Sequence, residues 1–170
     1  MYNLAMSTEQ NMLSDKNRYN GYLTFYVSDK VFAVSLLKVR EILECCEITV
    51  IPRLPQYIRG AINLRGNVIP VLDLASVLGY GATEISKRTC IVVVEIHYEG
   101  ESIITGVLVG SVSQVLNLSI DDAVKPPSFG GNVDTRFIEA MGKINEKFVV
   151  ILDISKIISI DDIDSLDLCG

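Results

Sequence analysis

Four cysteines and one histidine are the residues of this chain best suited to covalent or metal chemistry. A thiolate activated by an imidazole is a common nucleophile, so Cys45, Cys46 or Cys90 with His97 would make a thiol-based enzyme or a redox sensor. No protease or redox motif surrounds these residues, no C-x-x-C pair occurs, and a single histidine supports a zinc site poorly. We therefore expect buried, reduced thiols and no metal or other cofactor, and keep thiol chemistry as the alternative function.

Phosphate chemistry and nucleic-acid binding lack their usual sequence signals. The chain contains neither a G-x-x-x-x-G-K-[ST] nor a G-x-G-x-x-G segment, so no phosphate-binding loop is predicted. The formal net charge is −6, and Lys and Arg do not cluster, which excludes an electrostatic grip on DNA or RNA. The acidic pairs Asp121–Asp122 and Asp161–Asp162 are predicted to be solvated charges. These absences favour a non-catalytic module over an enzyme.

Length and composition indicate a folded chain that does not insert into a membrane. Of the 170 residues, 49% are hydrophobic and 21% charged, which excludes disorder across the whole chain. Residues 1–20 are polar and lack the apolar run of a signal peptide. Residues 102–120 carry no charge over 19 positions, but polar residues interrupt them, which favours strands over a membrane helix. We therefore expect a cytoplasmic protein.

The elements that must position any site are almost all β-strands. Short runs rich in β-branched and aromatic residues are separated by turn residues, which is typical of hairpins. The predicted strands are Tyr22–Val27, Val31–Val34, Ile58–Leu64, Val68–Leu72, Arg88–Ile96, Ile103–Val109, Val112–Leu118, Phe137–Ile144 and Phe148–Leu152. Asp73 and Asp153 each precede a short predicted helix, which their side chains are expected to cap. Residues 126–132 are predicted to form a loop.

The chain repeats itself. Val68–Leu78 matches Phe148–Ile158, 80 residues later, and Val31–Leu43 matches Ile104–Leu116, 73 residues later. Apolar positions coincide in both comparisons, and so do Asp73 and Asp153 in the first. A repeat of this size predicts two similar all-β lobes, each the size of a small barrel and neither very stable alone.

The repeat also suggests how the chain is divided. We expect a flexible N-terminal tail over residues 1–20 and a single domain over residues 21–160. Its first barrel is predicted over about residues 21–85 and its second over about residues 86–160, packed together. An acidic C-terminal tail over residues 161–170 follows.

Charged residues that only one repeat carries are candidates for function, because the fold itself does not need them. Arg40, Glu41, Arg65 and Gly66 have no counterpart in the second repeat. An arginine at a hairpin tip beside a glycine is suited to an interface, because its planar fork makes several directed hydrogen bonds. It is equally suited to pairing with a local carboxylate such as Glu41 or Asp73, with Gly66 supplying only the turn. The residues alone leave both interpretations of Arg65 open.

Several segments resemble the CheW family of bacterial chemotaxis coupling proteins. The most specific is the pattern G-x-x-N-L-R-G-x-x-x-P-x-x-D-L, and the resemblance covers roughly residues 21–160. The matching segments are Leu37–Ile42, Ile51–Pro55, Tyr57–Leu74 and Leu152–Ile154.

The resemblance implies an all-β CheW fold, with two five-stranded, SH3-like barrel subdomains and no enzymatic activity. It implies binding to the regulatory domain of a CheA-type histidine kinase and to the cytoplasmic tip of methyl-accepting chemoreceptors, in arrays at the membrane. Weak self-association is compatible with these partners. The receptor side would comprise Arg65, Gly60, Asn63, Leu64 and Gly66. The kinase side or groove would comprise Val39, Glu41 and Ile42. A scaffold of this fold that binds a kinase but no receptor is a further alternative.

Overall fold

The computed structural model describes residues 19–45, 47–119, 123–124, 136–144 and 146–158. The predicted loop over residues 126–132 and the acidic tail lie outside these residues, as does most of the N-terminal tail. The strands are β1 (Tyr19–Val27), β2 (Lys30–Ser35), β3 (Val39–Glu44), β4 (Ile58–Leu64), β5 (Asn67–Asp73), β6 (Cys90–Tyr98), β7 (Glu101–Val109), β8 (Ser111–Ser119), β9 (Ala123–Val124), β10 (Ile138–Ile144) and β11 (Lys147–Leu152). The helices are the 3₁₀ turn η1 (Leu36–Lys38), α2 (Leu74–Val77) and α3 (Ile154–Ile158).

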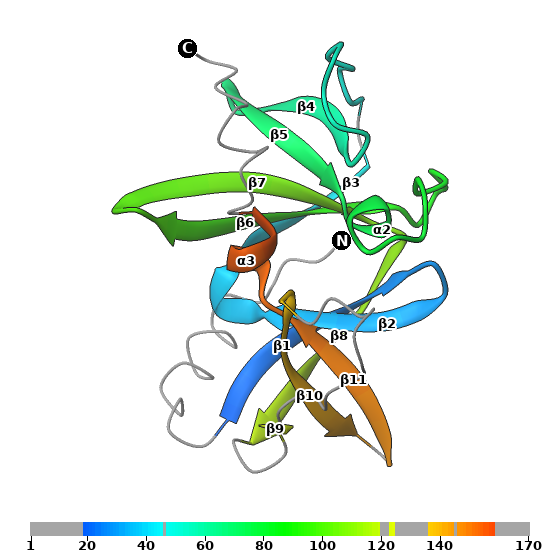
Figure 1. Ribbon diagram of the computed structural model, residues 1–170, viewed down its shortest axis with the longest axis vertical. Helices are drawn as coiled ribbons and strands as arrows, with labels where there is room; N and C mark the ends of the chain where they lie inside the picture. Colours follow the sequence, from blue (N-terminus) through cyan, green and yellow to red (C-terminus); the bar gives the residue numbers. More distant parts are fainter. Residues whose placement is uncertain (1–18, 46, 120–122, 125–135, 145, 159–170) are drawn as a thin grey trace.

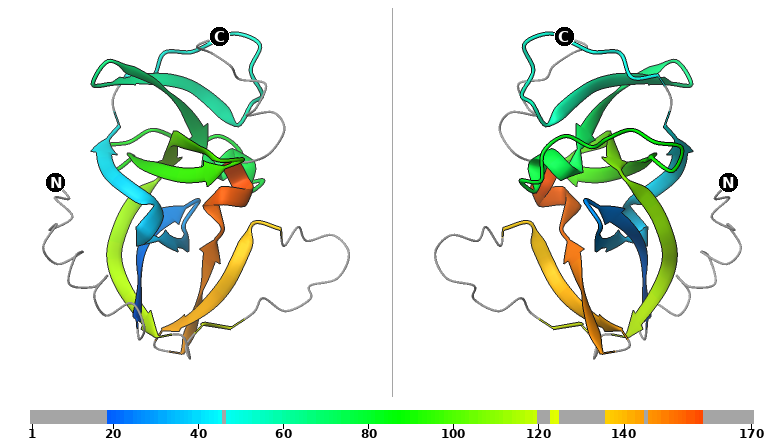
Figure 2. Two further views of the ribbon diagram at one scale, coloured as in Figure 1. Left: turned by 90° about the vertical axis from the view of Figure 1, so that its left-hand side faces the viewer. Right: turned by 90° about the vertical axis from the view of Figure 1, so that its right-hand side faces the viewer.

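The strands form two sheets that lie one above the other, with α2 and α3 between them (Figures 1 and 2). The six-stranded sheet has the order β8-β1-β2-β11-β10-β9, and the five-stranded sheet has the order β3-β6-β7-β5-β4. In the described part of the chain, no helix is long and apolar enough to cross a membrane.

The two sheets are not the successive halves that the sequence suggested, residues 21–85 and 86–160. The hairpin β1–β2 belongs to the sheet that also contains β8 to β11, whereas β3 to β7 form the other sheet. The chain crosses between the sheets twice, at η1 and again at Gly110, whose backbone N–H donates to the Tyr26 carbonyl at 2.9 Å. Each sheet therefore combines a hairpin from one repeat with strands from the other.

The repeat is nevertheless visible in the strand registers. Ile58 faces Leu72 across β4–β5, and Ile138 faces Leu152 across β10–β11, each pair followed by a bulge. The parallel contacts agree as well: β5 pairs with β7, and β11 pairs with β2 at the positions that the 80- and 73-residue offsets require. Equivalent positions in the two halves can therefore serve as matched controls for one another.

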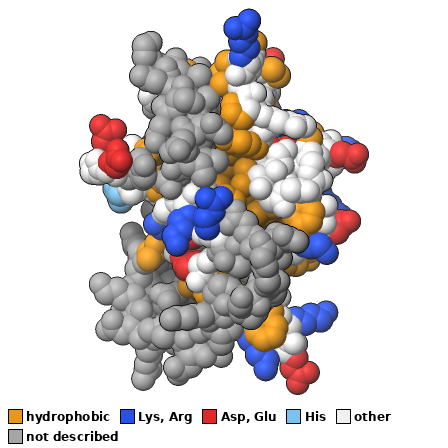
Figure 3. Space-filling model, viewed as in Figure 1, with side chains coloured by type: hydrophobic (Ala, Val, Ile, Leu, Met, Phe, Trp, Pro, Cys, Tyr) orange, Lys and Arg blue, Asp and Glu red, His pale blue; other side chains and the backbone are white. Residues whose placement is uncertain are grey.

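Three apolar clusters hold the sheets together. The largest has members in both sheets, in α2 and in α3, and so fills the space between the sheets. The period of two in β6 separates this cluster from the second one: Val92 and Val94 point into the first, whereas Ile91 and Val93 point into a cluster on the other face of the five-stranded sheet. The third cluster belongs to the six-stranded sheet. Hydrophobic side chains also reach the surface in patches among charged ones (Figure 3).

The closed five-stranded barrels that the resemblance implied are not confirmed. One sheet has six strands because the short β9 adds to β10, and neither sheet is closed by pairing between its described edge strands. In the five-stranded sheet, a single bridge links the chain after β3 to the opposite edge. There, Thr49 and Ala61 exchange two backbone hydrogen bonds of 2.9 Å. The sheet therefore curls far enough for its two edges to approach each other.

Candidate protein-interaction site

Arg65 lies at the tip of the hairpin between β4 and β5. Arg65 and Gly66 form its two-residue turn with φ of 51° and 87°, a left-handed conformation that matches the twist of the flanking strands. The Gly66 N–H donates to the Asn63 Oδ1 at 2.8 Å, which fixes the turn. Gly66 is therefore needed for the backbone conformation. The turn leaves 71% of the Arg65 side chain exposed.

Arg65 forms a two-pronged ion pair with Glu41. Its Nη1 lies 2.7 Å from Glu41 Oε2, and its Nη2 lies 3.0 Å from Glu41 Oε1. Glu41 is on β3 and Arg65 follows β4, so the pair joins the two edge strands of the curled sheet. The sequence left Glu41 and Asp73 as possible partners of Arg65, and in the structure the partner is Glu41. Two charged residues that only the first repeat carries are thus brought together.

The pair shifts the acidity of both groups. The hydrogen bond from Arg65 and then its charge hold the pKa of Glu41 below its ordinary value, against an opposing effect of partial burial. The carboxylate of Glu41 in turn raises the pKa of Arg65. Because the folded state lowers the pKa of Glu41, the stabilisation from the pair is present above the ordinary value of 4.5 and is lost as the pH falls through the folded value. The pair is therefore fully charged near neutral pH.

The pKa of Glu41, followed by NMR titration of its side-chain carboxyl carbon, is expected to lie below 4.5 in the folded protein. In Arg65→Gln it should return towards 4.5, because both the charge and the charge-assisted hydrogen bonds are lost. Arg40→Gln is the matched control, since Arg40 lowers the same pKa only by its more distant charge. Equal shifts in the two variants would contradict the assigned geometry.

Gly60, a predicted receptor-side residue, has a structural reason to be glycine. Its φ is 143°, and a Cβ built there would lie 2.0 Å from the Thr49 carbonyl oxygen, at the bridge that links the edges of the sheet. A backbone oxygen cannot move aside easily. Gly60 therefore acts through the fold, and its burial keeps it from touching a partner directly.

Gly60→Ala is expected to cost roughly 3 kcal/mol of unfolding free energy, because the added methyl overpacks a backbone contact. Gly66→Ala should cost only about 1 kcal/mol, since its positive φ is unfavourable for alanine but nothing lies within 4 Å of the new methyl. Urea denaturation of both variants tests this order. A Gly60→Ala variant as stable as the parent would remove the role assigned to the Thr49 bridge.

The remaining predicted site residues differ in accessibility. Val39 is buried in the cluster between the sheets and packs in the core, so its place on the kinase side or in the groove stays a prediction. Ile42 packs partly against the same cluster, and Leu64 packs partly against the cluster of the five-stranded sheet. Asn63 is exposed, although its amide oxygen is engaged in the turn. Glu41 and Arg65 are thus the charged part of the site.

Asp73 is the centre of a buried polar network that the sequence did not predict. Asp73 caps α2 as predicted, accepting from the Ala75 N–H at 3.1 Å. It also accepts from the backbone N–H and the hydroxyl of Thr83, at 2.8 and 2.6 Å, and pairs with Arg59 Nη1 at 3.1 Å. Asp73 itself is fully buried. The network fixes the segment after α2 against the end of β5.

The repeat carried a signal for this network. The residue 80 positions after Arg59 is Glu139, so only the first half can form the ion pair. Asp153 caps α3, accepting from the Ser155 N–H at 3.1 Å. Burial and the nearby Asp153 charge raise the pKa of Glu139, and Lys38 opposes that rise. The charge reversal between the equivalent positions Arg59 and Glu139 thus accompanies a different set of contacts in each half.

The described residues give no support to thiol chemistry. Burial raises the pKa of the Cys90 thiol, which disfavours the thiolate, and its Sγ donates to the Arg88 carbonyl at 3.3 Å. His97 is exposed near the end of β6, Cys45 is partly buried, and Cys46 lies outside the described residues. Within the described ranges, no three His, Cys, Asp or Glu side chains gather as a metal site would require.

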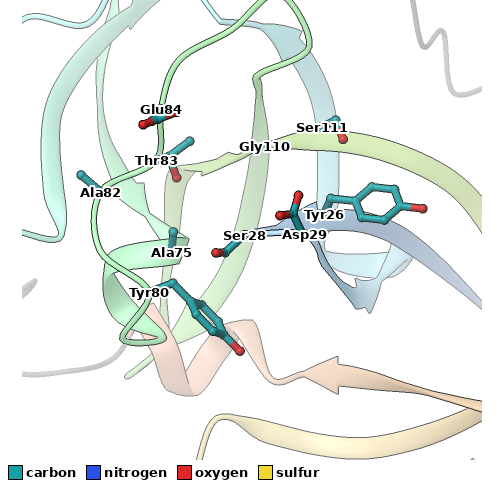
Figure 4. A pocket seen from close by; sticks show the side chains of 10 residues that line it. All are labelled: Tyr26, Ser28, Asp29, Ala75, Tyr80, Ala82, Thr83, Glu84, Gly110 and Ser111. Carbon is teal, nitrogen blue, oxygen red and sulfur yellow. The ribbon is translucent and has the colours of Figure 1, made fainter.

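A polar hollow of about 430 Å³ lies where the β1–β2 turn, the β7–β8 turn and the segment after α2 meet (Figure 4). Ser28, Asp29, Thr83 and Glu84 are among the residues that line it. The labelled side chains come from β1, α2, β8 and the turns beside them, and the ring of Tyr26 points away from the others. Neither a histidine nor a cysteine lines this hollow. The Thr83 hydroxyl, which is part of this lining, donates to Asp73 at 2.6 Å and so belongs to the buried network around that carboxylate.

Comparison with known proteins shows which family and which structures this chain is similar to. The CheW-like domain family matches residues 21–162. The chemotaxis protein CheW of Thermotoga maritima is 28% identical over 149 residues, covering 86% of this chain and 92% of that protein. Protein FrzA of Myxococcus xanthus is 30% identical and covers 81% of this chain and 84% of its own length. The crystal structure of the scaffolding protein TtCheW from Thermoanaerobacter tengcongensis has a TM-score of 0.73 at 29% identity, covering 84% of this chain and 90% of that one.

Proposed function

The chain belongs to the CheW family, and we propose that it is a non-catalytic chemotaxis adaptor that couples a CheA-type histidine kinase to methyl-accepting chemoreceptors. The family match spans nearly the whole domain, and it includes the hairpin that carries Arg65. Nothing in the described residues favours thiol chemistry instead.

The observation that carries this proposal is the exposed Glu41–Arg65 pair. Two N–H groups of the guanidinium bind Glu41, which leaves three of its five donors free of that carboxylate. An exposed ion pair contributes little to stability, because water and salt screen it. Glu41 therefore does more to hold the direction of Arg65 than to hold the fold. A fixed, exposed arginine suits the recognition of a partner's acceptor groups.

We assign the receptor contact to the β4–β5 hairpin, with Arg65 and Asn63 at its surface and Gly60, Leu64 and Gly66 supporting its shape. Glu41 and Ile42 on β3 form the adjoining edge, on the kinase side or in the groove. The protein would work in the cytoplasm, recruited to receptor arrays. Two weak contacts on one rigid domain give avidity, and each contact biases the populations of kinase states through the other.

Reconstitution of kinase signalling tests the proposal. Autophosphorylation of the CheA-type kinase from the same genome should rise in the presence of receptor fragments only when this protein is added. Kinase binding without any receptor-dependent activation would favour a scaffold of the same fold that serves no receptor. A variant lacking all four cysteines is also expected to support the same activation of the kinase.

A further inference from the structure

An apolar groove of about 550 Å³ opens between the six-stranded sheet and the segment after α2. It contains no residue of the Glu41–Arg65 site. Phe32 and Val150 form part of its floor, and Tyr80 and Phe148 stand at its rim, where 56% of Phe148 is exposed. Phe32 and Tyr80 lie with their ring centroids 6.5 Å apart. At the groove, the apolar cluster between the sheets is exposed at the surface. Phe32 belongs to that cluster, and Leu78 and Val150 pack against it.

The two halves of the repeat differ at one position of this groove. The residue 80 positions after Leu78 is Ile158 in α3. Ile158 is fully buried, whereas Leu78 is only partly buried and lines the groove. At this position the second half therefore buries its side chain in the core, whereas the first half leaves part of Leu78 exposed in the groove.

Basic side chains lie in and beside the groove. Among the residues that the structure describes, Lys30 is the charged one that lines it. Lys143 stands directly opposite Phe148 across β10–β11, and the Arg136 guanidinium lies 5.6 Å from the centroid of the Phe137 ring. In a chain with a net charge of −6, two lysines, Lys30 and Lys143, thus lie at this apolar groove, with the acidic Asp29 and Glu146 in the adjoining turns.

We propose that this groove docks an acidic amphipathic segment of another protein. Apolar side chains of the segment would pack between Tyr80 and Phe148, and its carboxylates would face Lys30 and Lys143. Aromatic side chains in half-open pockets are typical anchors of such contacts, and complementary rim charges speed association and select the partner. The contact is independent of the receptor contact assigned above and would add a third attachment point to the domain.

Two short synthetic peptides test the proposal on the full chain. Both carry Leu and Phe on one helical face, and the opposite face carries Glu in one peptide and Lys in the other. We expect the Glu peptide to shift backbone amide resonances of β2, β10 and β11, and to bind at least tenfold more tightly than the Lys peptide. Phe148→Glu and Lys30→Glu should each weaken it at least tenfold. Val68→Glu is the matched control, since Val68 is the counterpart of Phe148 and is 54% exposed.

Each other result overturns the proposal. Equal affinity for the two peptides would show an apolar site without charge selection. The same conclusion would follow if a neutral hydrophobic dye bound to the groove and neither peptide did. A Glu peptide that binds Phe148→Glu as tightly as the parent would place the contact elsewhere. Dimerisation that Phe148→Glu abolishes, without any peptide binding, would assign the groove to a second copy of the chain. Unchanged far-ultraviolet circular dichroism and thermal midpoints of the variants establish that they remain folded.

Discussion

Arg65→Glu weakens binding to the receptor tip by roughly tenfold or more and leaves the urea midpoint nearly unchanged, if the Glu41–Arg65 pair serves recognition. The substitution places two carboxylates side by side at the hairpin tip, and it removes every donor that the guanidinium offered to a partner. The stability effect is small because the Arg65 side chain is 71% exposed. Calorimetric titration with a receptor-tip fragment, alongside urea denaturation, measures both quantities.

The charge swap Glu41→Arg with Arg65→Glu separates recognition from structure. It restores an ion pair at the same place but exchanges which strand presents the cation. Recovery of stability without recovery of receptor binding is the expected result. Recovery of both would mean that any ion pair between the sheet edges suffices, and that the partner does not read the guanidinium.

Asp73→Ala is expected to lower the unfolding free energy by about 3–5 kcal/mol, the usual cost of breaking a buried ion pair. The variant removes the carboxylate partner of Arg59, which keeps its hydrogen bond to the Thr83 carbonyl, and it also removes two acceptors from Thr83 and uncaps α2. Urea denaturation measures the loss. If the variant does not fold, Asp73→Asn replaces it. This substitution keeps a capping oxygen but removes the charge, so it should lower the unfolding free energy by a smaller amount.

Asp153→Ala is the matched control, because Asp153 caps α3 in the same way but has Glu139 where Asp73 has Arg59. Its expected cost is about 1 kcal/mol, the value of a helix cap alone. Equal losses in the two variants would contradict the account, since they would leave the Arg59 and Thr83 contacts without energetic consequence.

The elements of this fold could be predicted from the sequence because their hydrophobic periods are local. The hairpins at Arg65–Gly66 and before Phe148 follow from turn residues between alternating strands. The repeat offsets make the pairing of β5 with β7 equivalent to that of β11 with β2, although they do not predict either pairing by themselves. Which hairpin joins which sheet could not be predicted. The pattern of β3 is equally compatible with pairing to neighbouring β2 or to distant β6, and only packing between the sheets decides.

The candidate site could be predicted in part. Comparing the repeats identified Glu41 and Arg65 as charges that the fold does not need, but their contact depends on how far the five-stranded sheet curls, which a period of two does not encode. For the same reason Asp73 remained a possible partner of Arg65 until the structure placed Arg59 beside it. Val39 was assigned to a partner because its strand carries the motif, yet it faces the core.

The central claim is that one small domain binds two partners at once. The most direct measurement is calorimetric titration of the protein with the regulatory domain of the CheA-type kinase from the same genome, followed by addition of a receptor-tip fragment to the complex. We expect micromolar binding in both steps, with the second step alone weakened by Arg65→Glu. Binding to neither partner would contradict it, and would mean that the CheW fold persists here without its coupling role.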